Sequence, residues 1–325
     1  MKNIAIACAM VLILLAGCQT SDDTPESTNQ QEETNIQDPQ IDPTDTIDTQ
    51  EKPDGPWHVV SQMQFEYRNN LVAFMNHEFG IRGNTGGRDR KIYYTSNGGQ
   101  SWAGSENNPG WPTAVDIVSA QSIWKCGHSK FNLSKDGGQT WQILTNPIEE
   151  CRLLDFLNDQ HGWAMSTSKL VVTKDGGNNW EEIIIPEAIG KIAAISLQTS
   201  QEGYLLDFDR NLYHTIDGGQ SWSAQTLEMT DSDLDMMDLN YPSAAIRFMD
   251  DENGVVVMNL AGGGKSELLA LHTADGGQTW EHHVLPVGLG VLYLSHDGQY
   301  ITVTEPGSQG KVTLLANQAV AESRN

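Results

Sequence analysis

The 325-residue sequence predicts an all-β fold, a six-bladed β-propeller, from three observations. An octapeptide that ends in tryptophan recurs five times. Short apolar runs flank each copy, and in four units glycine follows an apolar residue of the first run at a fixed offset of six. The tryptophans are 39, 39, 42 and 58 residues apart. A repeat of this length indicates units that cannot bury their own apolar faces and must stack on one another.

Each octapeptide suits a turn between the third and fourth strands of a unit. Glycines at its centre accept positive φ, the acidic side chain accepts backbone hydrogen bonds, and the preceding Ser or Thr adds a hydroxyl. The tryptophan then buries a large apolar surface. In the first copy asparagine replaces aspartate and keeps the acceptor oxygen. The turn residues are Asn97, Asp136, Asp175, Asp217 and Asp275, and the tryptophans are Trp102, Trp141, Trp180, Trp222 and Trp280.

The runs around each octapeptide predict four antiparallel strands, the composition of one propeller blade. In four units an apolar residue is followed six positions later by glycine, as in Phe156 and Gly162. Five octapeptides give five blades. Residues 287–317 supply three more strands, and the segment from Trp57 to Val60 resembles a fourth strand, so we expect the N-terminal strand to close the last blade. The long gap before Trp280 keeps seven blades as the alternative, although insertions at 230–241 and 260–266 would explain it.

The repeated octapeptide resembles the Asp box, or bacterial neuraminidase repeat, from about Leu71 to Leu285. The added Gly162-Trp163 step resembles the photosystem II stability and assembly factor branch more than sialidases. This resemblance implies a scaffold or assembly-factor-like role. It does not imply photosynthesis, because only the blade motif is shared.

The N-terminus has the pattern of a bacterial lipoprotein. Residues 1–17 form a secretory signal, and Leu15-Ala16-Gly17-Cys18 fits a lipobox in which Cys18 is lipidated. The apolar run is too short for a transmembrane anchor, which needs about 20 residues. Residues 18–56 read as an acidic, disordered tether and residues 57–325 as the propeller. The predicted location is the bacterial cell envelope, facing away from the cytoplasm and anchored to the membrane through lipid.

Charge limits the classes of partner. The chain has a net charge of −24, which argues against nucleic acid. The expected partner is a protein or a glycan of unknown identity, with the propeller a monomer. The sequence predicts no metal and no cofactor. Cys126 and Cys151 are expected to form a disulfide between adjacent blades, with two buried free thiols as the alternative.

No catalytic residue emerges from the motifs. The Phe-Arg-Ile-Pro motif, arginine trio and nucleophile pair that sialidases need are not found. Aligning the blades places Ala73, Asp116, Asp155, Ser196 and Arg247 in a ring at the axis. Asp116, Asp155 and Arg247 are therefore candidates for an axial binding site, with structural bonds between blades as the other interpretation. We expect a non-catalytic binding or scaffold protein. The alternatives are a sialidase-like or other glycoside hydrolase acting on surface glycans, and a sensor lipoprotein accessory to a membrane complex.

Overall fold

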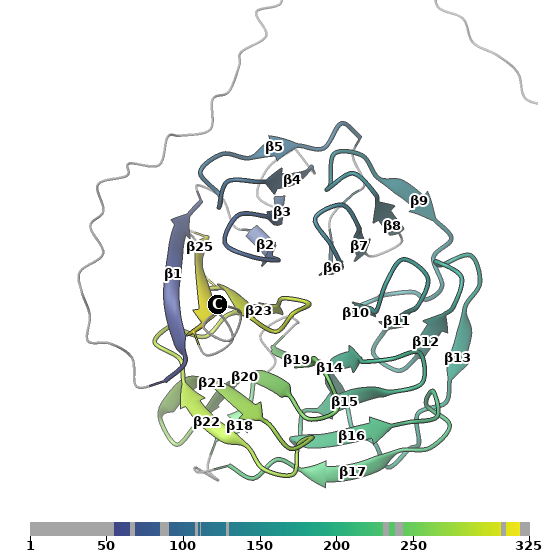
Figure 1. The fold of residues 1–325 in the computed structure, drawn as a ribbon, viewed down its shortest axis with the longest axis vertical. Helices are drawn as coiled ribbons and strands as arrows, with labels where there is room; N and C mark the ends of the chain where they lie inside the picture. The colour runs from purple at the N-terminus through teal and green to yellow at the C-terminus, as the bar shows by residue number, and fades with distance from the viewer. Residues whose placement is uncertain are drawn as a thin grey trace, which may run out of the picture. The chain divides into compact units, whose positions relative to one another are not determined.

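The computed structural model describes residues 55–65, 69–84, 91–107, 110, 112–127, 130–229, 234–237, 243–306 and 310–318. Its elements are 25 strands, which form six antiparallel sheets (Figure 1). The predicted signal peptide, Cys18 and all of the tether except Gly55 and Pro56 lie outside the described residues. So does Trp111.

The first three blades follow one another along the chain. Blade 1 contains β2 (Asn69–Phe74), β3 (Gly80–Asn84), β4 (Ile92–Thr95) and β5 (Ala103–Gly104). Blade 2 contains β6 (Ala114–Ile117), β7 (Ile123–Cys126), β8 (Phe131–Ser134) and β9 (Gln142–Leu144). Blade 3 contains β10 (Leu153–Phe156), β11 (Gly162–Met165), β12 (Leu170–Thr173) and β13 (Glu181–Ile183).

The remaining blades vary this plan. Blade 4 contains β14 (Ile192–Leu197), β15 (Gly203–Asp207), β16 (Asn211–Thr215) and β17 (Ser223–Thr226). Blade 5 contains β19 (Ala244–Phe248), β20 (Gly254–Gly262), β21 (Lys265–Thr273) and β22 (Glu281–Val284), and a short extra strand, β18 (Asp235–Met236), pairs with β20. Blade 6 contains β23 (Val291–Leu294), β24 (Tyr300–Thr304), β25 (Lys311–Asn317) and β1 (Trp57–Gln64).

The innermost strands β2, β6, β10, β14, β19 and β23 contact one another in turn around the axis (Figure 1). This arrangement confirms the six-bladed propeller, and the seven-bladed alternative is wrong. The long gap before Trp280 holds β18 and a lengthened β20–β21 hairpin. Residues 260–266, expected to be an insertion, instead extend the pairing of β20 with β21 as far as Gly262 and Lys265.

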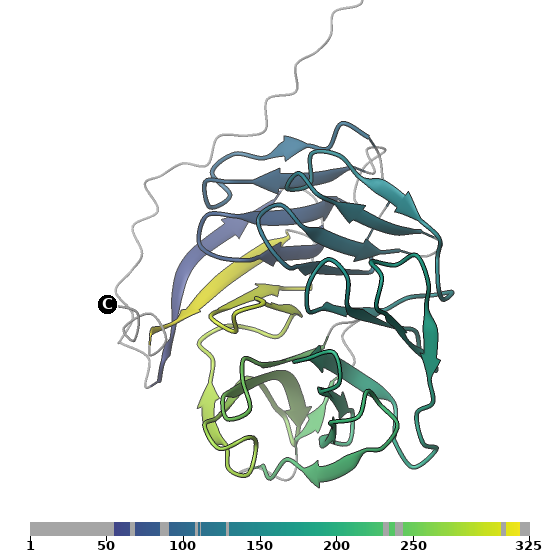
Figure 2. The ribbon, with the colours of Figure 1, turned by 45° about the vertical axis from the view of Figure 1, so that its right-hand side comes forward.

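The predicted closure by the N-terminal strand is confirmed. Strand β1 pairs antiparallel with β25, from Trp57 opposite Asn317 to Gln64 opposite Lys311. Figure 2 shows the two strands side by side, purple against yellow. The pairing covers an edge of β25 that would otherwise expose its backbone groups.

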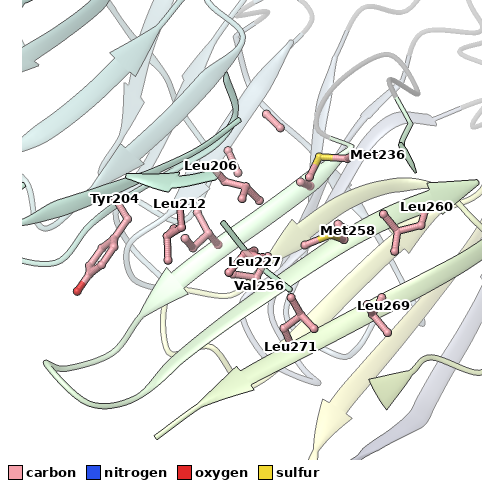
Figure 3. Close-up of a cluster of buried hydrophobic side chains, with 14 of the residues drawn as sticks. Tyr204, Leu206, Leu212, Leu227, Met236, Val256, Met258, Leu260, Leu269 and Leu271 are labelled. Atoms are coloured by element: carbon pink, nitrogen blue, oxygen red, sulfur yellow. The ribbon is translucent and has the colours of Figure 1, made fainter. Parts of the chain in front are cut away.

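Aromatic side chains pack each blade against the next. Trp124 on β7 stacks on Phe156 of β10, with ring centroids 3.9 Å apart. A Cβ on Gly162 would lie 2.2 Å from the Phe156 ring, which explains glycine six positions after the aromatic residue. The same type of interface between blades 4 and 5 holds a cluster that includes Tyr204, Leu206 and Met258 (Figure 3).

Strand direction gives the propeller two faces. In blade 3, the Gly176 N–H in the octapeptide turn donates to the carbonyl of Gln160 in the turn between β10 and β11. The turns after first strands and after third strands therefore lie on one face, which we call the Asp-box face. Connections after second and fourth strands lie on the other, which we call the loop face. Trp57 begins a fourth strand, so the chain enters the propeller on the Asp-box face.

Within the described residues there is no helix long and apolar enough to cross a membrane.

Trp57 tests the closure of the ring. Its side chain is 1% exposed, packs in the core between blades 5 and 6, and donates through Nε1 to His272 Nε2 at 2.7 Å. Substitution Trp57→Ala should lower the free energy of unfolding by about 3–5 kcal/mol, because it opens a cavity at this interface. Denaturant unfolding measures the effect. Gln62→Ala, at an exposed position of the same strand, is the control and should change stability by less than about 0.5 kcal/mol. Equal effects of the two substitutions would contradict the role assigned to Trp57.

Candidate functional site at the propeller axis

The octapeptide turns are closed by their own side chains. In the fifth copy the Gly277 N–H donates to Thr273 Oγ1, the Thr279 N–H donates to Asp275 Oδ1, and the Thr273 hydroxyl donates to the same carboxylate, each at 2.8 Å. The first copy uses Asn97 in the same way, since its Oδ1 accepts the Ser101 N–H at 3.0 Å. The same bonds recur at Asp136, Asp175 and Asp217.

Electrostatics agree with a local role for these turns. Hydrogen bonds from the Ser221 hydroxyl and backbone N–H lower the pKa of Asp217 to about 2. Trp280 Nε1 donates to the Gly277 carbonyl at 3.0 Å, and Trp141 and Trp180 bond their own turns in the same way. Because each carboxylate is occupied within its own turn, the turns form no shared site.

The buried hydroxyl of Thr273 holds the fifth turn closed by accepting the Gly277 N–H. Substitution Thr273→Val keeps the shape but leaves the buried Gly277 N–H without its acceptor. We expect a loss of about 1–3 kcal/mol in the free energy of unfolding, measured with denaturant. Thr226→Val, at an exposed hydroxyl on β17, is the matched control and should cost less. A Thr273→Val protein as stable as the control would show that the turn does not need this bond.

The structure joins Cys126 and Cys151 in a disulfide. Cys126 ends β7 in blade 2, and Cys151 lies just before β10 in blade 3. Both side chains are fully buried. The bond therefore links the second strand of one blade to the approach to the first strand of the next.

The five aligned axial residues lie on the innermost strands, and three of them bond the following blade in the same way. Asp116 Oδ2 accepts the Phe156 N–H at 2.6 Å, Asp155 Oδ2 accepts the Leu197 N–H, and Ser196 Oγ accepts the Phe248 N–H at 3.4 Å. Each acceptor precedes the apolar residue of its own strand. One repeated position thus connects blades 2, 3, 4 and 5 in order.

Two other positions depart from this pattern. Ala73 has no acceptor, and the Ile117 N–H in blade 2 donates instead to the hydroxyl of Tyr293 in blade 6, at 3.1 Å. The hydroxyl of Tyr293, from blade 6 on the other side of blade 1, therefore takes the place of the acceptor that Ala73 lacks. Thr302 on β24 accepts the Phe74 N–H at 3.1 Å.

Arg247 in blade 5 reaches the two carboxylates of blades 2 and 3. Its Nη1 lies 2.7 Å from Asp155 Oδ1, and its Nη2 lies 4.0 Å from Asp116 Oδ1. The three side chains are at least 92% buried. The structure therefore brings together the three residues that the alignment placed at the axis, which we call the axial triad: Asp116, Asp155 and Arg247.

Burial and charge oppose each other within the axial triad. Burial raises the pKa of Asp155 to about 6, and the Arg247 guanidinium limits the rise. Burial likewise raises the pKa of Asp116, again against the effect of Arg247. For Arg247, burial lowers the pKa, but the attraction of Asp155 and Asp116 outweighs it and leaves the pKa raised. Burial, and then the charge of Arg247, lowers the pKa of His296 to about 4, so this imidazole is neutral at pH 7.

A cavity at the axis extends from the triad toward the loop face. Its lining includes the triad and Tyr293, near the ends of the innermost strands, and Arg152, just before β10. Including its open mouth, the cavity has a volume of about 540 Å³. The Arg152 N–H donates to the Met165 carbonyl at the loop-face end of β11, which identifies the face on which the mouth opens. The arrangement is a narrow apolar channel with a charged floor, suited to holding a polar group.

Sequence reasoning missed Tyr293 and Thr302. Both belong to blade 6, which has no octapeptide and could not be aligned with the others. Leu294 pairs with Ile301, seven residues later, where the other blades place the partner at six. The signal that remained was the apolar run from Val291 to Leu294, in which Tyr293 occupies the position before the last residue, as Asp116 does in β6.

The fold and its turns define a six-bladed propeller of the Asp-box type. A family model described as photosynthesis system II assembly factor YCF48 matches residues 187–290, which hold blades 4 and 5. The predicted resemblance is confirmed in this segment, which is similar to that assembly factor family. Any link to sialidases is secondary.

Solved structures with similar chains have low sequence identity. YCF48 bound to D1 peptide is 18% identical, with a TM-score of 0.48, and the match covers 81% of this chain and 96% of that one. YCF48 from Cyanidioschyzon merolae is 17% identical, with a TM-score of 0.47 and coverage of 82% and 99%. The WD40 propeller domain of Doa1 is 11% identical, with a TM-score of 0.48 and coverage of 80% and 97%. No curated protein matches the sequence.

Removing the guanidinium of Arg247 tests the balance of the axial triad. Substitution Arg247→Met should cost about 3–5 kcal/mol of unfolding free energy at pH 8, because two buried carboxylates lose their counterion. The pKa of Asp155 already lies above its ordinary value of 3.8, so its protonation stabilises the fold at low pH and this contribution is lost as the pH rises through about 6. Loss of Arg247 raises that pKa further.

The cost of Arg247→Met should therefore shrink as the pH falls from 8 to 5, measured by denaturant unfolding at each pH. Lys169→Met is the control, because Lys169 pairs with Glu182 on the exposed surface at 3.2 Å. That substitution should cost about 0–1 kcal/mol at every pH. A cost for Arg247→Met that is independent of pH would contradict the coupling to Asp155.

Proposed function

We propose that this protein is a lipid-anchored, extracytoplasmic propeller that binds a protein partner on its loop face, in a non-catalytic scaffold or assembly role. One observation carries the proposal: the axial cavity opens on the face opposite the one where the chain enters at Trp57. An anchor that precedes Trp57 would leave the mouth of the cavity accessible. The relation to an assembly factor family supports a protein as the partner.

Two features support a location outside the cytoplasm. The Leu15–Cys18 lipobox is a signal for export and lipidation. The buried disulfide between Cys126 and Cys151 is of the kind that persists in oxidising compartments and is rare in reducing ones. Two acyl chains on Cys18 would give stable attachment to a membrane.

The Asp-box face, on which the chain enters at Trp57, would lie nearer the membrane. Its turns carry acidic residues, which are unfavourable next to an anionic surface. Among them are Asp159, Glu202, Asp250, Asp251, Glu252 and Asp297. Anionic headgroups would repel this face. Repulsion would hold the propeller off the membrane instead of pressing it against the lipid, and would leave partners free to approach the loop face.

Anchoring is tested by labelling cells with a radioactive or alkyne-bearing fatty acid. The wild-type chain should incorporate label and sediment with membranes, and Cys18→Ser should do neither. Protease added to intact cells or spheroplasts should degrade the anchored chain. Labelling of the Cys18→Ser protein, or protection from the protease, would contradict the proposed attachment and location.

The binding face is tested by photo-cross-linking from two matched lysine positions of blade 3. Lys169 lies before β12 on the loop face and pairs with Glu182, whereas Lys174 follows β12 on the Asp-box face and pairs with Glu181 at 3.0 Å. A photoreactive amino acid at 169 should trap a discrete protein in cells, and one at 174 should not. If a protein is trapped from position 174 alone, the partner binds on the Asp-box face, and the proposed binding on the loop face is wrong. Hydrolysis of a sialoside or other glycoside, abolished by Asp155→Asn, would overturn the non-catalytic role.

A further inference from the structure

We infer that the axial cavity receives a primary ammonium group on an alkyl chain, supplied by a lysine side chain of the partner protein. This inference rests on the proposed binding function and names the chemistry of its central contact. It depends on three properties of the cavity: the charge of its floor, the polar atoms that remain available there, and the apolar character of its walls.

The floor of the cavity holds two carboxyl groups and one guanidinium. When both carboxylates of the axial triad are ionised, two negative groups face one guanidinium. His296, whose pKa burial and the charge of Arg247 lower, is neutral at pH 7, and the hydroxyl of Tyr293 is held in the neutral form by burial. In that state a single added cation would neutralise the net charge of the floor, whereas an added anion would double its excess of negative charge. In a buried site of low dielectric constant this difference is large.

An acceptor oxygen on the floor is available to a ligand. Asp116 Oδ2 holds the Phe156 N–H at 2.6 Å, but Asp116 Oδ1 lies 4.0 Å from Arg247 Nη2. That separation exceeds a hydrogen bond, so this oxygen can still accept one from a ligand. Asp155 differs, because both of its oxygens are engaged, one by the Leu197 N–H and one by Arg247. Asp116 is therefore the residue that the structure assigns to the ammonium group.

The walls between the floor and the mouth are apolar. Leu71, Val115, Ile195 and Ala245 line the channel from four different blades. A lysine side chain has four methylene groups that pack against such surface while its ammonium group reaches a polar site. Arg152, the other cation in the lining, has an interaction of its own. An arginine ligand is less suitable, because its planar guanidinium is broader than an ammonium group and presents five N–H donors.

Binding of small probes to the full-length protein tests the inference. Calorimetric or NMR titrations at pH 7.5 compare N-acetyl-lysine amide, the neutral N-acetyl-norleucine amide, N-acetyl-glutamate amide and free 1,5-diaminopentane. The lysine probe should bind at least about tenfold more tightly than the neutral one, a difference of about 1.4 kcal/mol. The glutamate probe should bind most weakly. Equal affinity for lysine and norleucine probes, preference for glutamate, or no saturable binding would overturn the inference.

Two variants locate the site, and a third controls for charge. Asp116→Asn keeps an acceptor for the Phe156 N–H but removes the negative charge, and should weaken lysine binding at least about tenfold. Ala245→Phe fills the channel without changing charge and should weaken binding of all probes, so it tests the site even if Asp116→Asn fails to fold. Glu182→Gln removes one negative charge from the exposed surface and should leave affinity unchanged. An Asp116→Asn or Ala245→Phe protein that binds the lysine probe as well as wild type would contradict the location.

The remaining outcomes separate this inference from the proposed function. Binding of diaminopentane without binding of the lysine probe would overturn the assignment to a protein side chain and indicate a free polyamine. Trapping of a partner from position 169 with no binding of any amine would leave the proposed function standing and reject the lysine contact. Amine binding with no partner trapped from 169 would reject the partner face instead.

Discussion

The pairing of β1 with β25 is the interaction on which the rest of this structure depends. A propeller is a sheet array bent into a ring, and each blade covers its apolar face only if both neighbours are present. Blade 6 has only three strands of its own, so without β1 its outermost backbone groups would be exposed. Trp57 adds a buried side chain to the seam between blades 5 and 6, so backbone pairing and core packing act together at the same point.

The geometry of the axial site depends on the closure of the ring by β1 and β25. Blade 6 supplies Tyr293 to blade 2 and Thr302 to blade 1, so both contacts exist only in a closed ring. Arg247 reaches carboxylates on blades 2 and 3, which lie three and two positions around the ring from blade 5, respectively. A change in the number of blades would alter these spans. The charged floor of the cavity is thus a property of six blades and not of any one of them.

Repeated and unrepeated residues have different roles in this chain. The octapeptide side chains recur because each blade needs the same turn, and their hydrogen bonds stay within that turn. At the axial position, by contrast, the six blades carry Ala73, Asp116, Asp155, Ser196, Arg247 and Tyr293. Equivalent backbone positions there hold different chemistry, which is what a site at the centre of a symmetric fold requires if it is to favour one ligand.

The sequence by itself determined the blades, their turns and the closing strand, because octapeptides, apolar runs and glycine offsets are local signals repeated at a fixed spacing. It also placed Asp116, Asp155 and Arg247 on first strands, since alignment of the repeats transfers position from blade to blade. Only the tertiary structure decided that Arg247 pairs with both carboxylates and that Tyr293 bypasses Ala73. Those contacts join residues 92 to 176 positions apart and depend on the reach of side chains across the axis. No local pattern encodes a distance across the ring, because that distance is set by how many blades close it.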